Sequence, residues 1–507
     1  MTGTLVNDTV NGANTTSASD ANVLDAVVIG AGLTGLTAAY ELAVRSPQPA
    51  GKVLVLEAAE RVGGCVTTNS ADGYLWEEGP NSFSANPELL GLIVDVGLKD
   101  EMVLADGKLP RFVYWDDKLQ PVPMSPGAFL KTSLISDAGK FRLVRGAMGF
   151  VAPKMGADLS ARDGEETIRE FFTRHLGPEA VEKLVIPFIS GVYAGDVDQL
   201  SAPAAFAKMA AMEARGGGLG AGAALTLMER AKAKKANPPR TDLPVVKRGE
   251  LGSFKTGLQA LPQAIAQKLG DRVKLNHRVT AIEPQPNNTY RLTIDTPDGP
   301  TTVTTKSVLM ATPTNTTGKL LAPLAPHSTE AIAQIPYPTV ACVILAYPKK
   351  HFNSDMEGFG NLIPRSLGID TLGTIWASSL FPGRAPDGWQ SLINFIGGST
   401  NPAIAQMTEE EIVQQVHADV SRILLKDGAP QPKVLACHVW DRAIPQYTLG
   451  HQGRLDALQA GLEQYPGLFA GSNYVGGVAV GDCVKNGLRL AGIVAEHLST
   501  QAPIPVA

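Results

Sequence analysis

Residues 27–35 read Val27-Val28-Ile29-Gly30-Ala31-Gly32-Leu33-Thr34-Gly35. The apolar residues predict a buried strand, and the G-x-G-x-x-G spacing predicts a tight turn into a helix. A second apolar run, from Val53 to Leu56, ends at Glu57. A chain that holds the ADP half of a dinucleotide has strand, glycine turn, helix, strand and acid in this order.

Each glycine of the turn has a physical task. Gly30 lets the strand turn sharply, Gly32 lets backbone N–H groups approach a pyrophosphate, and Gly35 lets the helix lie close to the sheet. The phosphates then sit at the positive N-terminus of the helix, and Glu57 accepts hydrogen bonds from the ribose. A glycine turn without a ligand is the alternative, but the spacing of the whole unit favours the ligand.

Composition limits the class of protein. The chain has 507 residues, of which 44% are hydrophobic and 18% are charged, and this is typical of two or three compact domains. The net charge of -5 gives no reason to expect a nucleic-acid partner. The four cysteines lack C-x-x-C spacing, so we predict neither a metal site nor a disulfide framework.

The N-terminal residues differ from the rest of the chain. Residues 1–22 are rich in Thr, Ser and Asn and contain no Lys or Arg, which is wrong for a signal or transit peptide. We therefore expect a disordered leader. No window of 18 apolar residues is free of charge and proline, so a membrane-spanning helix is not predicted.

Two internal segments have unusual composition. Residues 128–153 combine apolar side chains with four cations, Lys131, Lys140, Arg142 and Arg145, against one acid, Asp137. Such a segment can rest on an anionic membrane surface, although an ordinary solvated helix fits the pattern equally well. Residues 216–224 are rich in glycine and alanine, and we expect a mobile surface excursion there.

Alternating and continuous apolar runs predict strands in the second half of the chain. They lie at residues 290–294, 302–308, 340–346, 373–378 and 392–396. A strand at 467–471 and a helix from about 482 to 497 close the chain.

A second glycine motif narrows the choice of dinucleotide. Glu57-x-x-x-Arg61-x-Gly63-Gly64 places another flexible turn beside the same ribose and pyrophosphate, which favours an extended FAD over a nicotinamide cofactor. Near the C-terminus, Val478-Ala479-Val480-Gly481 opens a helix whose positive end can face the flavin pyrimidine. A plain glycine-rich turn is the alternative for this second segment.

These motifs resemble the flavin-containing amine oxidase superfamily. Seven further segments resemble the protoporphyrinogen oxidase family of the plastid and cyanobacterial type, in the same order from about Ala26 to His497. The segments are 78–82, 111–113, 187–196, 358–360, 372–374, 396–400 and 443–447. There are two departures: Cys65 stands where many amine oxidases have arginine, and Ile375 stands where some relatives have leucine.

The resemblance implies an α/β fold, α+β overall, in three parts. A Rossmann-like FAD-binding domain, discontinuous in sequence, takes residues 23–90, 250–315 and 435–500. A mixed-sheet substrate-binding domain takes residues 91–110 and 316–434 with part of 190–250. A mainly helical domain for membrane association and substrate entry takes residues 111–210.

The resemblance and the two glycine motifs imply two groups of site residues. Arg111 is expected to face a carboxylate of the substrate or of carboxylate herbicides. Leu362, Ile375 and Phe395 are expected to sandwich a tetrapyrrole, and Gly191 to line the same cavity. The residues expected to bind FAD are Gly30, Ala31, Gly32, Leu33, Thr34, Gly35, Glu57, Arg61, Gly63, Gly64, Gly79, Pro80, Asn81, Ser82, Val279, Trp440, Val478, Ala479 and Val480.

The implied activity is the oxidation of protoporphyrinogen IX to protoporphyrin IX. Non-covalent FAD would remove six electrons in three rounds, and three molecules of oxygen would become hydrogen peroxide. Hydride loss between electron-rich pyrroles leaves a delocalised cation, so a strong general base is not required and none is identified. The implied partners are the tetrapyrrole, molecular oxygen and a peripheral membrane surface, in a plastid or a cyanobacterium, with a homodimer as a further possibility.

Three other protein classes share the glycine fingerprint. An amine or polyamine oxidase needs an aromatic cage, of which residues 445–447 and 471–474 offer little. Carotenoid desaturases remain a lesser alternative among enzymes. A binding protein of the GDP-dissociation inhibitor type keeps the fold without flavin, but the retained Arg61-x-Gly63-Gly64 counts against it.

Overall fold

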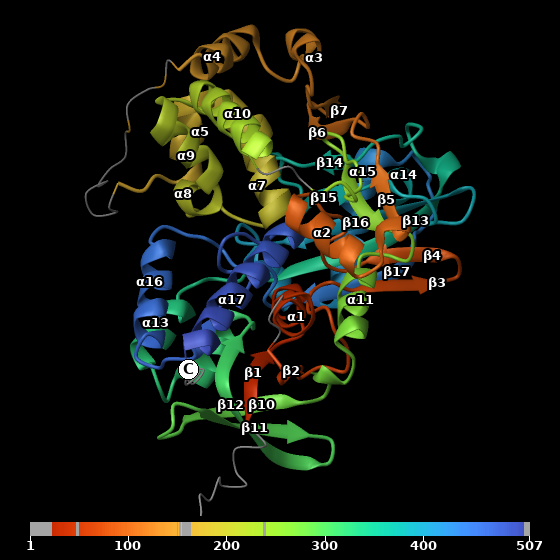
Figure 1. Ribbon diagram of the computed structural model, residues 1–507. Coiled ribbons are helices and arrows are strands. Elements are labelled where there is room, and N and C mark those ends of the chain that lie inside the picture. The colour runs from red at the N-terminus through yellow and green to blue at the C-terminus, as the bar shows by residue number, and fades with distance from the viewer. Residues whose placement is uncertain are drawn as a thin grey trace, which may run out of the picture.

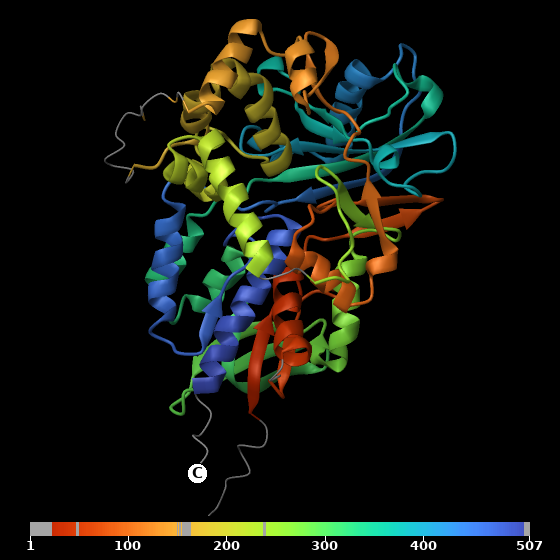
Figure 2. The same cartoon turned by 45° about the horizontal axis from the view of Figure 1, so that its top comes forward.

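A computed structural model describes residues 23–46, 50–149, 151, 154, 164–236 and 240–500. The predicted leader, residues 1–22, lies outside this set. Figures 1 and 2 show three regions: one sheet with its helices at the bottom, a second sheet at the upper right and a helical region at the upper left. The mixed α/β fold class is confirmed.

The first sheet has seven strands in the order β10-β11-β12-β1-β2-β9, with β18 beside β12. Strands β1, β2, β9, β12 and β18 pair in parallel, whereas β10, β11 and the first half of β12 pair antiparallel. The strands are β1 (Leu24–Ile29), β2 (Val53–Leu56), β9 (Val273–Lys274), β10 (Arg278–Pro284), β11 (Tyr290–Thr296), β12 (Gly299–Met310) and β18 (Leu468–Ala470).

The predicted glycine turn joins β1 to helix α1 (Leu33–Tyr40). Gly30 has a φ of +103°, which favours glycine. A Cβ at Gly35 would collide with the carbonyl oxygen of Gly30, so only glycine lets α1 lie this close to the strand. Helix α17 (Val480–Thr500) packs beside α1, where Gly487 leaves room for Thr34 and Thr37.

The second sheet also has seven strands, in the order β17-β13-β16-β15-β14-β6-β7. All pairs are antiparallel except β14 with β6. Helix α15 (Glu409–Leu424) covers one face with Ile412, Val416 and Val420. The strands are β6 (Arg111–Trp115), β7 (Lys118–Pro121), β13 (Val340–Pro348), β14 (Gly360–Leu362), β15 (Thr371–Ile375), β16 (Trp389–Gly397) and β17 (Lys433–Trp440).

Several elements lie in a different part of the fold from the one that the predicted domain boundaries, which stay predictions, would give them. Residues 111–121 form β6 and β7 of the second sheet rather than helical structure, and β17 extends that sheet to Trp440. Helix α2 (Pro87–Asp95) packs its leucines into the core beside α1, so residues 91–95 belong with the first sheet. These strands are short and their partners lie far away in the chain, so local patterns do not reveal the pairing.

The helical region contains α3 to α10. Its helices are α3 (Pro126–Lys131), α4 (Asp137–Ala147), α5 (Ile168–Leu176), α6 (Pro178–Ala180), α7 (Ile186–Tyr193), α8 (Ala202–Ala205), α9 (Ala207–Gly216) and α10 (Leu219–Ala236). Helices α9 and α10 continue this region past residue 210, where the predicted helical domain ends. Part of the basic apolar segment, residues 150, 152 and 153, lies outside the described residues.

The excursion expected at 216–224 is helical, because these residues turn from α9 into α10. Gly217, with a φ of +68°, ends α9. A Cβ at Gly222 would collide with the carbonyl oxygen of Met212, and one at Gly220 with that of Ala147. The small residues are therefore required for close helix packing.

The remaining elements connect or cover the two sheets. The hairpin of β3 and β4 carries Tyr74 and Trp76 onto the second sheet. The elements are β3 (Thr68–Ala71), β4 (Tyr74–Glu77), β5 (Met102–Ala105), β8 (Leu251–Phe254), α11 (Ala260–Leu269), α12 (Thr314–Leu321), α13 (Pro326–Ala333), α14 (Ala377–Leu380) and α16 (His451–Leu462). Within the described part of the chain, no helix has the length and apolarity to cross a bilayer.

Candidate active site

A cavity of about 610 Å³ runs along the carboxyl ends of β1 and β2 toward the N-terminus of α17. Both predicted cofactor motifs reach it from opposite ends of the chain. Twelve of the residues expected to bind FAD line the cavity: Gly30, Gly32, Leu33, Thr34, Glu57, Gly63, Gly64, Pro80, Val279, Trp440, Val478 and Val480.

Glu57 fixes the end of the cavity nearest β2. Its Oε2 accepts a hydrogen bond from the Ala31 N–H at 2.7 Å, and its Oε1 accepts one from the Ala59 N–H at 2.9 Å. An ionised carboxylate has about four lone-pair sites, so each oxygen can accept a second hydrogen bond. Glu57 therefore ties the glycine turn to β2 and can still accept hydrogen bonds from a ribose.

The double-glycine turn lies against the first glycine turn. The Gly63 N–H donates to the Ala31 carbonyl at 2.8 Å. Arg61 does not line the cavity; its Nη2 donates to the Gly64 carbonyl at 2.9 Å, and its Nη1 lies 3.3 Å from the carbonyls of Val62 and Val66. Arg61 therefore holds the shape of the turn through backbone carbonyls.

The space beside Gly32 fits the expected pyrophosphate. A Cβ built at Gly32 meets no atom within 4 Å, so this backbone faces the open cavity. Gly32 precedes the first residue of α1, where backbone N–H groups and the helix dipole attract phosphate oxygens. The residues present therefore fit FAD, with Glu57 at the ribose and the glycines at the phosphates.

The cavity is also lined by Trp440 of β17 and by Val478 and Val480 at the start of α17. The indole Nε1 of Trp440 donates to the Glu78 carbonyl at 2.7 Å, which holds the segment leading to Pro80. Cys65 and Cys483 also line this cavity, together with Tyr337 and Arg442. We expected none of these four as site residues, and non-covalent attachment of FAD stays a prediction.

Six other expected FAD residues do not line the cavity. Gly79 packs against the Cys65 carbonyl, where a Cβ would collide, and Gly35 packs against Gly30. These two glycines shape the cavity from behind. The others are Ala31, Asn81, Ser82 and Ala479, and Ala31 contributes its backbone to the contacts with Glu57 and Gly63.

The second sheet brings four expected substrate residues to one face. Arg111 of β6 pairs with Gly360 of β14, which pairs with Ile375 of β15. Residues paired across neighbouring strands point to the same side of a sheet, as do residues two apart in one strand. Arg111 and Ile375 therefore share a face, and Leu362, two residues after Gly360, joins them.

Phe395 completes this surface. Leu362 pairs with Gly373, and Gly373 pairs with Phe395, so a residue without a side chain separates the two apolar groups. From helix α7, Gly191 approaches so closely that a Cβ there would collide with Leu362 Cδ2. All five residues are half-buried, and we name this set the substrate groove after its expected role, which stays a prediction: Arg111, Gly191, Leu362, Ile375 and Phe395.

Arg111 has unused hydrogen-bonding capacity at the end of the groove. Its Nη2 donates to the Gly249 carbonyl at 3.1 Å, and its guanidinium carbon lies 4.0 Å from the centre of the Phe359 ring. Its Nη1 is buried without a partner among the described residues. Burial lowers the pKa of Arg111 from its usual value, which indicates a cation without a protein counter-charge.

Helix α7 carries two apolar residues that we did not predict. Phe188 and Val192 are 42% and 47% exposed, and they lie three residues before and one residue after Gly191. Because they are four residues apart, Phe188 and Val192 lie on one exposed apolar face of α7. The i, i+4 spacing of Phe188 and Val192 was the available signal.

Comparison with known proteins shows the family. The model of the flavin containing amine oxidoreductases matches residues 33–495. Protoporphyrinogen oxidase 1 of chloroplasts from Spinacia oleracea is 44% identical over 486 residues, which cover 94% of this chain and 85% of the relative. The chloroplast protoporphyrinogen oxidase of Oryza sativa subsp. japonica is 43% identical over 489 residues, with 94% and 89% covered.

A solved structure shares the whole architecture. It comes from Exiguobacterium sp. 255-15, is assigned to protoporphyrinogen oxidase, and superimposes with a TM-score of 0.74 at 26% identity. The match covers 93% of this chain and 99% of that one. These likenesses confirm the resemblance seen in the sequence and FAD as the cofactor. The chain therefore belongs to the flavin-containing amine oxidoreductase family, in the branch formed by the protoporphyrinogen oxidases.

Proposed function

We propose that this chain oxidises protoporphyrinogen IX to protoporphyrin IX with bound FAD and molecular oxygen. The observation that carries the proposal is a shared sheet face. Val340 and Cys342 lie two apart in β13; Trp440 pairs with Val340, and Phe395 pairs with Cys342. Trp440, which lines the FAD cavity, and Phe395 of the substrate groove therefore point to the same side of the second sheet.

The groove suits the chemistry of the substrate. Protoporphyrinogen IX is a large apolar macrocycle with two propionates, so it needs apolar walls and a cation at one end. Leu362, Ile375 and Phe395 supply the walls. The unused donor of Arg111 can grip a propionate and fix which meso carbon faces the flavin.

The residues act by placement rather than by proton abstraction. When bound, FAD supplies the oxidant for each two-electron step. Three rounds remove six electrons and six protons, and three molecules of oxygen become three of hydrogen peroxide. Between rounds, tautomerisation moves hydrogens within the macrocycle, so that the same meso carbon can be oxidised again. One orientation of the substrate, set by Arg111 and the groove walls, then serves all three rounds.

Aerobic turnover tests this function directly. The holoenzyme is mixed with protoporphyrinogen IX, and porphyrin fluorescence and peroxide are followed together, with heat-denatured protein as the control for spontaneous oxidation. We expect three peroxides for each porphyrin. If protein with FAD bound gave neither signal above the control, the proposal would be wrong and another oxidase activity would have to be sought.

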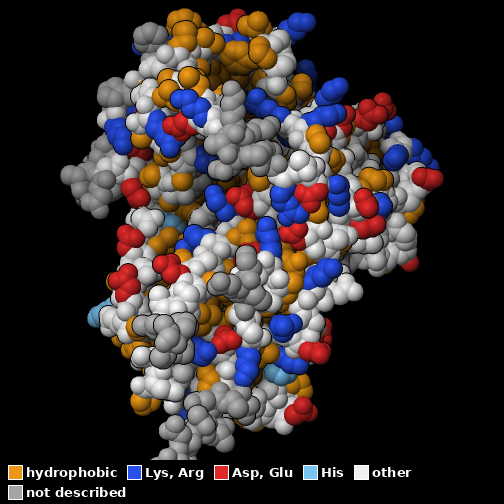
Figure 3. All heavy atoms as spheres, in the orientation of Figure 1, with side chains coloured by type: hydrophobic (Ala, Val, Ile, Leu, Met, Phe, Trp, Pro, Cys, Tyr) orange, Lys and Arg blue, Asp and Glu red, His pale blue; other side chains and the backbone are white. Residues whose placement is uncertain are grey.

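Membrane attachment is the second part of the proposal. Large apolar side chains are exposed on α3 and α4 and just outside their ends: Met124, Leu130, Phe141, Val144 and Met148. Figure 3 shows apolar side chains gathered at the top of the molecule, over these helices. Leu130 and Phe141 are 72% and 70% exposed, with Lys131, Arg142 and Arg145 on the same helices. Apolar groups among cations suit an anionic lipid surface.

One of the four predicted cations has a protein partner instead. Lys140 forms an ion pair with Asp137 at 3.1 Å and also contacts the Leu130 carbonyl. We infer that the protein lies peripherally on a plastid or cyanobacterial membrane. The plastid part of this inference rests on its plant relatives, which are chloroplast proteins. The homodimer stays a prediction, which the mass of the holoenzyme in solution would test.

A further inference from the structure

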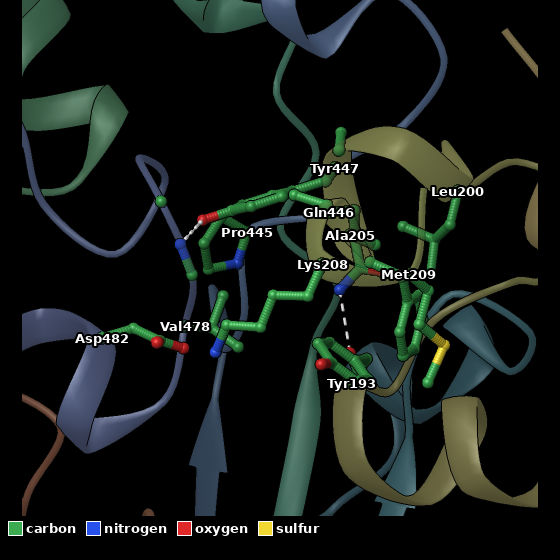
Figure 4. A pocket seen from close by; sticks show the side chains of 15 residues that line it. Tyr193, Leu200, Ala205, Lys208, Met209, Pro445, Gln446, Tyr447, Val478 and Asp482 are labelled. Carbon is green, nitrogen blue, oxygen red and sulfur yellow. Dashed lines mark hydrogen bonds between the residues drawn. The ribbon is translucent and has the colours of Figure 1, made fainter. Parts of the chain in front are cut away.

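The dipeptide Gln446-Tyr447 lies between the two halves of the site. Figure 4 shows both side chains in the wall of a pocket of about 300 Å³, between the helical region and the N-terminal end of α17. Each side chain makes a hydrogen bond to a different element, drawn as dashed lines. Both residues are buried, at 3% and 6% exposed.

Tyr447 holds the loop that leads to the flavin end of the FAD cavity. Its hydroxyl donates to the Asn473 carbonyl at 2.7 Å and accepts from the Gly477 N–H at 3.0 Å. One oxygen therefore joins both ends of residues 473–477. Asn473 and Val478, at the two sides of this span, line the FAD cavity.

The loop depends on these two hydrogen bonds for its order, because it contains two adjacent glycines. Gly476 and Gly477 have φ values of +77° and +129°. Glycine loses more conformational freedom on ordering than other residues, so a loop of this composition is not rigid by itself. The bonds to Tyr447 supply the order that the backbone lacks.

His451 holds the Tyr447 ring in place. Its ring stacks on Tyr447 with centroids 4.1 Å apart and planes 12° apart, and its Nε2 lies 3.0 Å from the Tyr474 carbonyl. Burial lowers the pKa of His451 to about 4, so the ring is neutral at pH 7. A carbonyl can only accept, so Nε2 carries the proton and donates.

Gln446 holds helix α7, which we call the substrate helix, in the same way. Its Nε2 donates to the Tyr193 carbonyl at 2.9 Å and to the Ile444 carbonyl at 3.0 Å. Tyr193 is the last residue of α7, and Gly191, two residues earlier, packs against Leu362 in the substrate groove. The backbone of the dipeptide is itself fixed, because Gln446 N–H donates to the Pro336 carbonyl and Ser201 N–H donates to the Tyr447 carbonyl.

We propose that Gln446 and Tyr447 are positioning residues that hold the substrate helix α7 and the flavin-side loop 473–477 at a fixed separation. The proposal rests on the function above, since that function makes Gly191 part of the substrate site. Two adjacent residues joined by one peptide bond cannot move independently. A displacement of about 1 Å can lower a rate about a hundredfold, so such a connection matters for turnover.

The Tyr447→Phe variant tests the flavin side. Phenylalanine keeps the stacking on His451 and removes both hydrogen bonds to the loop. We expect the FAD dissociation constant, measured by fluorescence titration of the apoprotein, to rise about tenfold. The dissociation constant for protoporphyrin IX, measured on FAD-saturated protein, should stay unchanged.

The Gln446→Met variant tests the substrate side with the opposite pattern. Methionine has a similar length and no N–H to donate to Tyr193. We expect the dissociation constant for protoporphyrin IX to rise about tenfold while FAD affinity stays unchanged. In both variants, the rate of flavin reduction by protoporphyrinogen IX should fall when it is measured without oxygen at saturating FAD and substrate. The reason is that the separation between α7 and the loop 473–477 is no longer fixed.

Tyr465→Phe is the matched control. This variant loses the hydrogen bond from the Tyr465 hydroxyl to the Leu324 carbonyl at 2.9 Å. Tyr465 contacts neither α7 nor the loop 473–477. Thermal unfolding of every variant reports any general loss of stability. Variants that lower the melting temperature as Tyr465→Phe does, yet keep both dissociation constants and the saturated reduction rate, would overturn the proposal. Wild type that fails to turn over would instead contradict the proposed function.

Discussion

The guanidinium carbon of Arg111 lies 4.0 Å from the centre of the Phe359 ring, so the ring face of Phe359 supports the cation. This contact leaves the orientation of Arg111 fixed by an aromatic ring and by the Gly249 carbonyl, neither of which neutralises its charge. A cation held in this way remains available to an anionic group of a ligand.

Replacing Arg111 by alanine should weaken substrate binding selectively. A hydrogen bond to a charged group contributes about 1.5–3 kcal/mol, so we expect KM for protoporphyrinogen IX to rise about 10- to 100-fold. FAD content should stay at the wild-type level, because Arg111 does not line the FAD cavity. Steady-state kinetics and the flavin absorbance of the same preparations measure both. Unchanged KM would exclude Arg111 as the carboxylate partner.

Replacing Gly191 by alanine should narrow the substrate groove. The new methyl group would collide with Leu362 Cδ2, so the Leu362 side chain would have to shift within the groove. We expect kcat/KM to fall about tenfold or more. Gly453→Ala, in helix α16, is the control: its Cβ meets no atom within 4 Å, so it should keep full activity and slightly raise the melting temperature. Equal effects of the two variants would contradict this.

Two glycines of the first turn should respond differently to alanine. Gly32→Ala places its methyl group in the open cavity, so the apoprotein should keep its melting temperature but bind FAD much more weakly. Gly35→Ala drives its methyl group into the Gly30 carbonyl, so the apoprotein itself should lose stability. Calorimetry of the two apoproteins and their FAD titrations separate a ligand contact from a packing contact.

Glu77 should make stability fall as pH rises. Burial raises the pKa of this carboxyl from 4.5 to about 7, although the Thr68 hydroxyl and the Leu258 N–H both donate to it. Between these pH values the folded protein binds more protons than the unfolded chain. The stabilising contribution is therefore complete below pH 4.5 and is lost as pH rises through about 7, by about 3 kcal/mol.

The Glu77→Gln variant should remove this pH dependence. An amide can still accept from Leu258 and donate to the Thr68 hydroxyl, so the packing is kept. Urea unfolding between pH 5 and pH 8 should show a smaller loss of stability in the variant than in the wild type. Parallel curves for the two proteins would mean that Glu77 is charged in the folded state throughout this range.

Replacing Leu130 and Phe141 by serine should weaken membrane attachment. Burying one large apolar side chain contributes about 1.5–3 kcal/mol, so loss of two should move most of the protein from the floating fraction to the bottom of a gradient with anionic liposomes. Val434→Ser is the control, since Val434 is also exposed but lies on β17 of the second sheet. A wild type that does not float would contradict membrane attachment altogether.

The sequence patterns account for more of the lining of the FAD cavity than of the substrate groove. Gly30, Gly32, Glu57 and the 478–480 segment were identifiable because each backbone task there demands a particular residue type at a particular spacing. Arg61 was identified with the motif, but its contacts with carbonyls of its own turn appear only in three dimensions.

The substrate groove depends on strand pairing that no local pattern contains. Arg111 reaches the same face as Ile375 only because β6 joins β14 in parallel, and residues 111–121 are too short a stretch to predict that. Resemblance supplied the groove residues, whereas Phe188, Val192 and Cys65 were missed. The glycines at 216–224 did not reveal the turn between two helices, because close helix packing and a loop favour the same small residues.

The order of the strands in the first sheet also governs how the protein is made. β1 and β2 are synthesised early, but β12, which pairs with β1, and β18 and α17, which complete the cavity, come much later. Domains otherwise fold one after another as a chain leaves the ribosome. Here the N-terminal unit lacks β18 and the start of α17 until residues 468–480 are translated, so the complete FAD cavity can form only after that point.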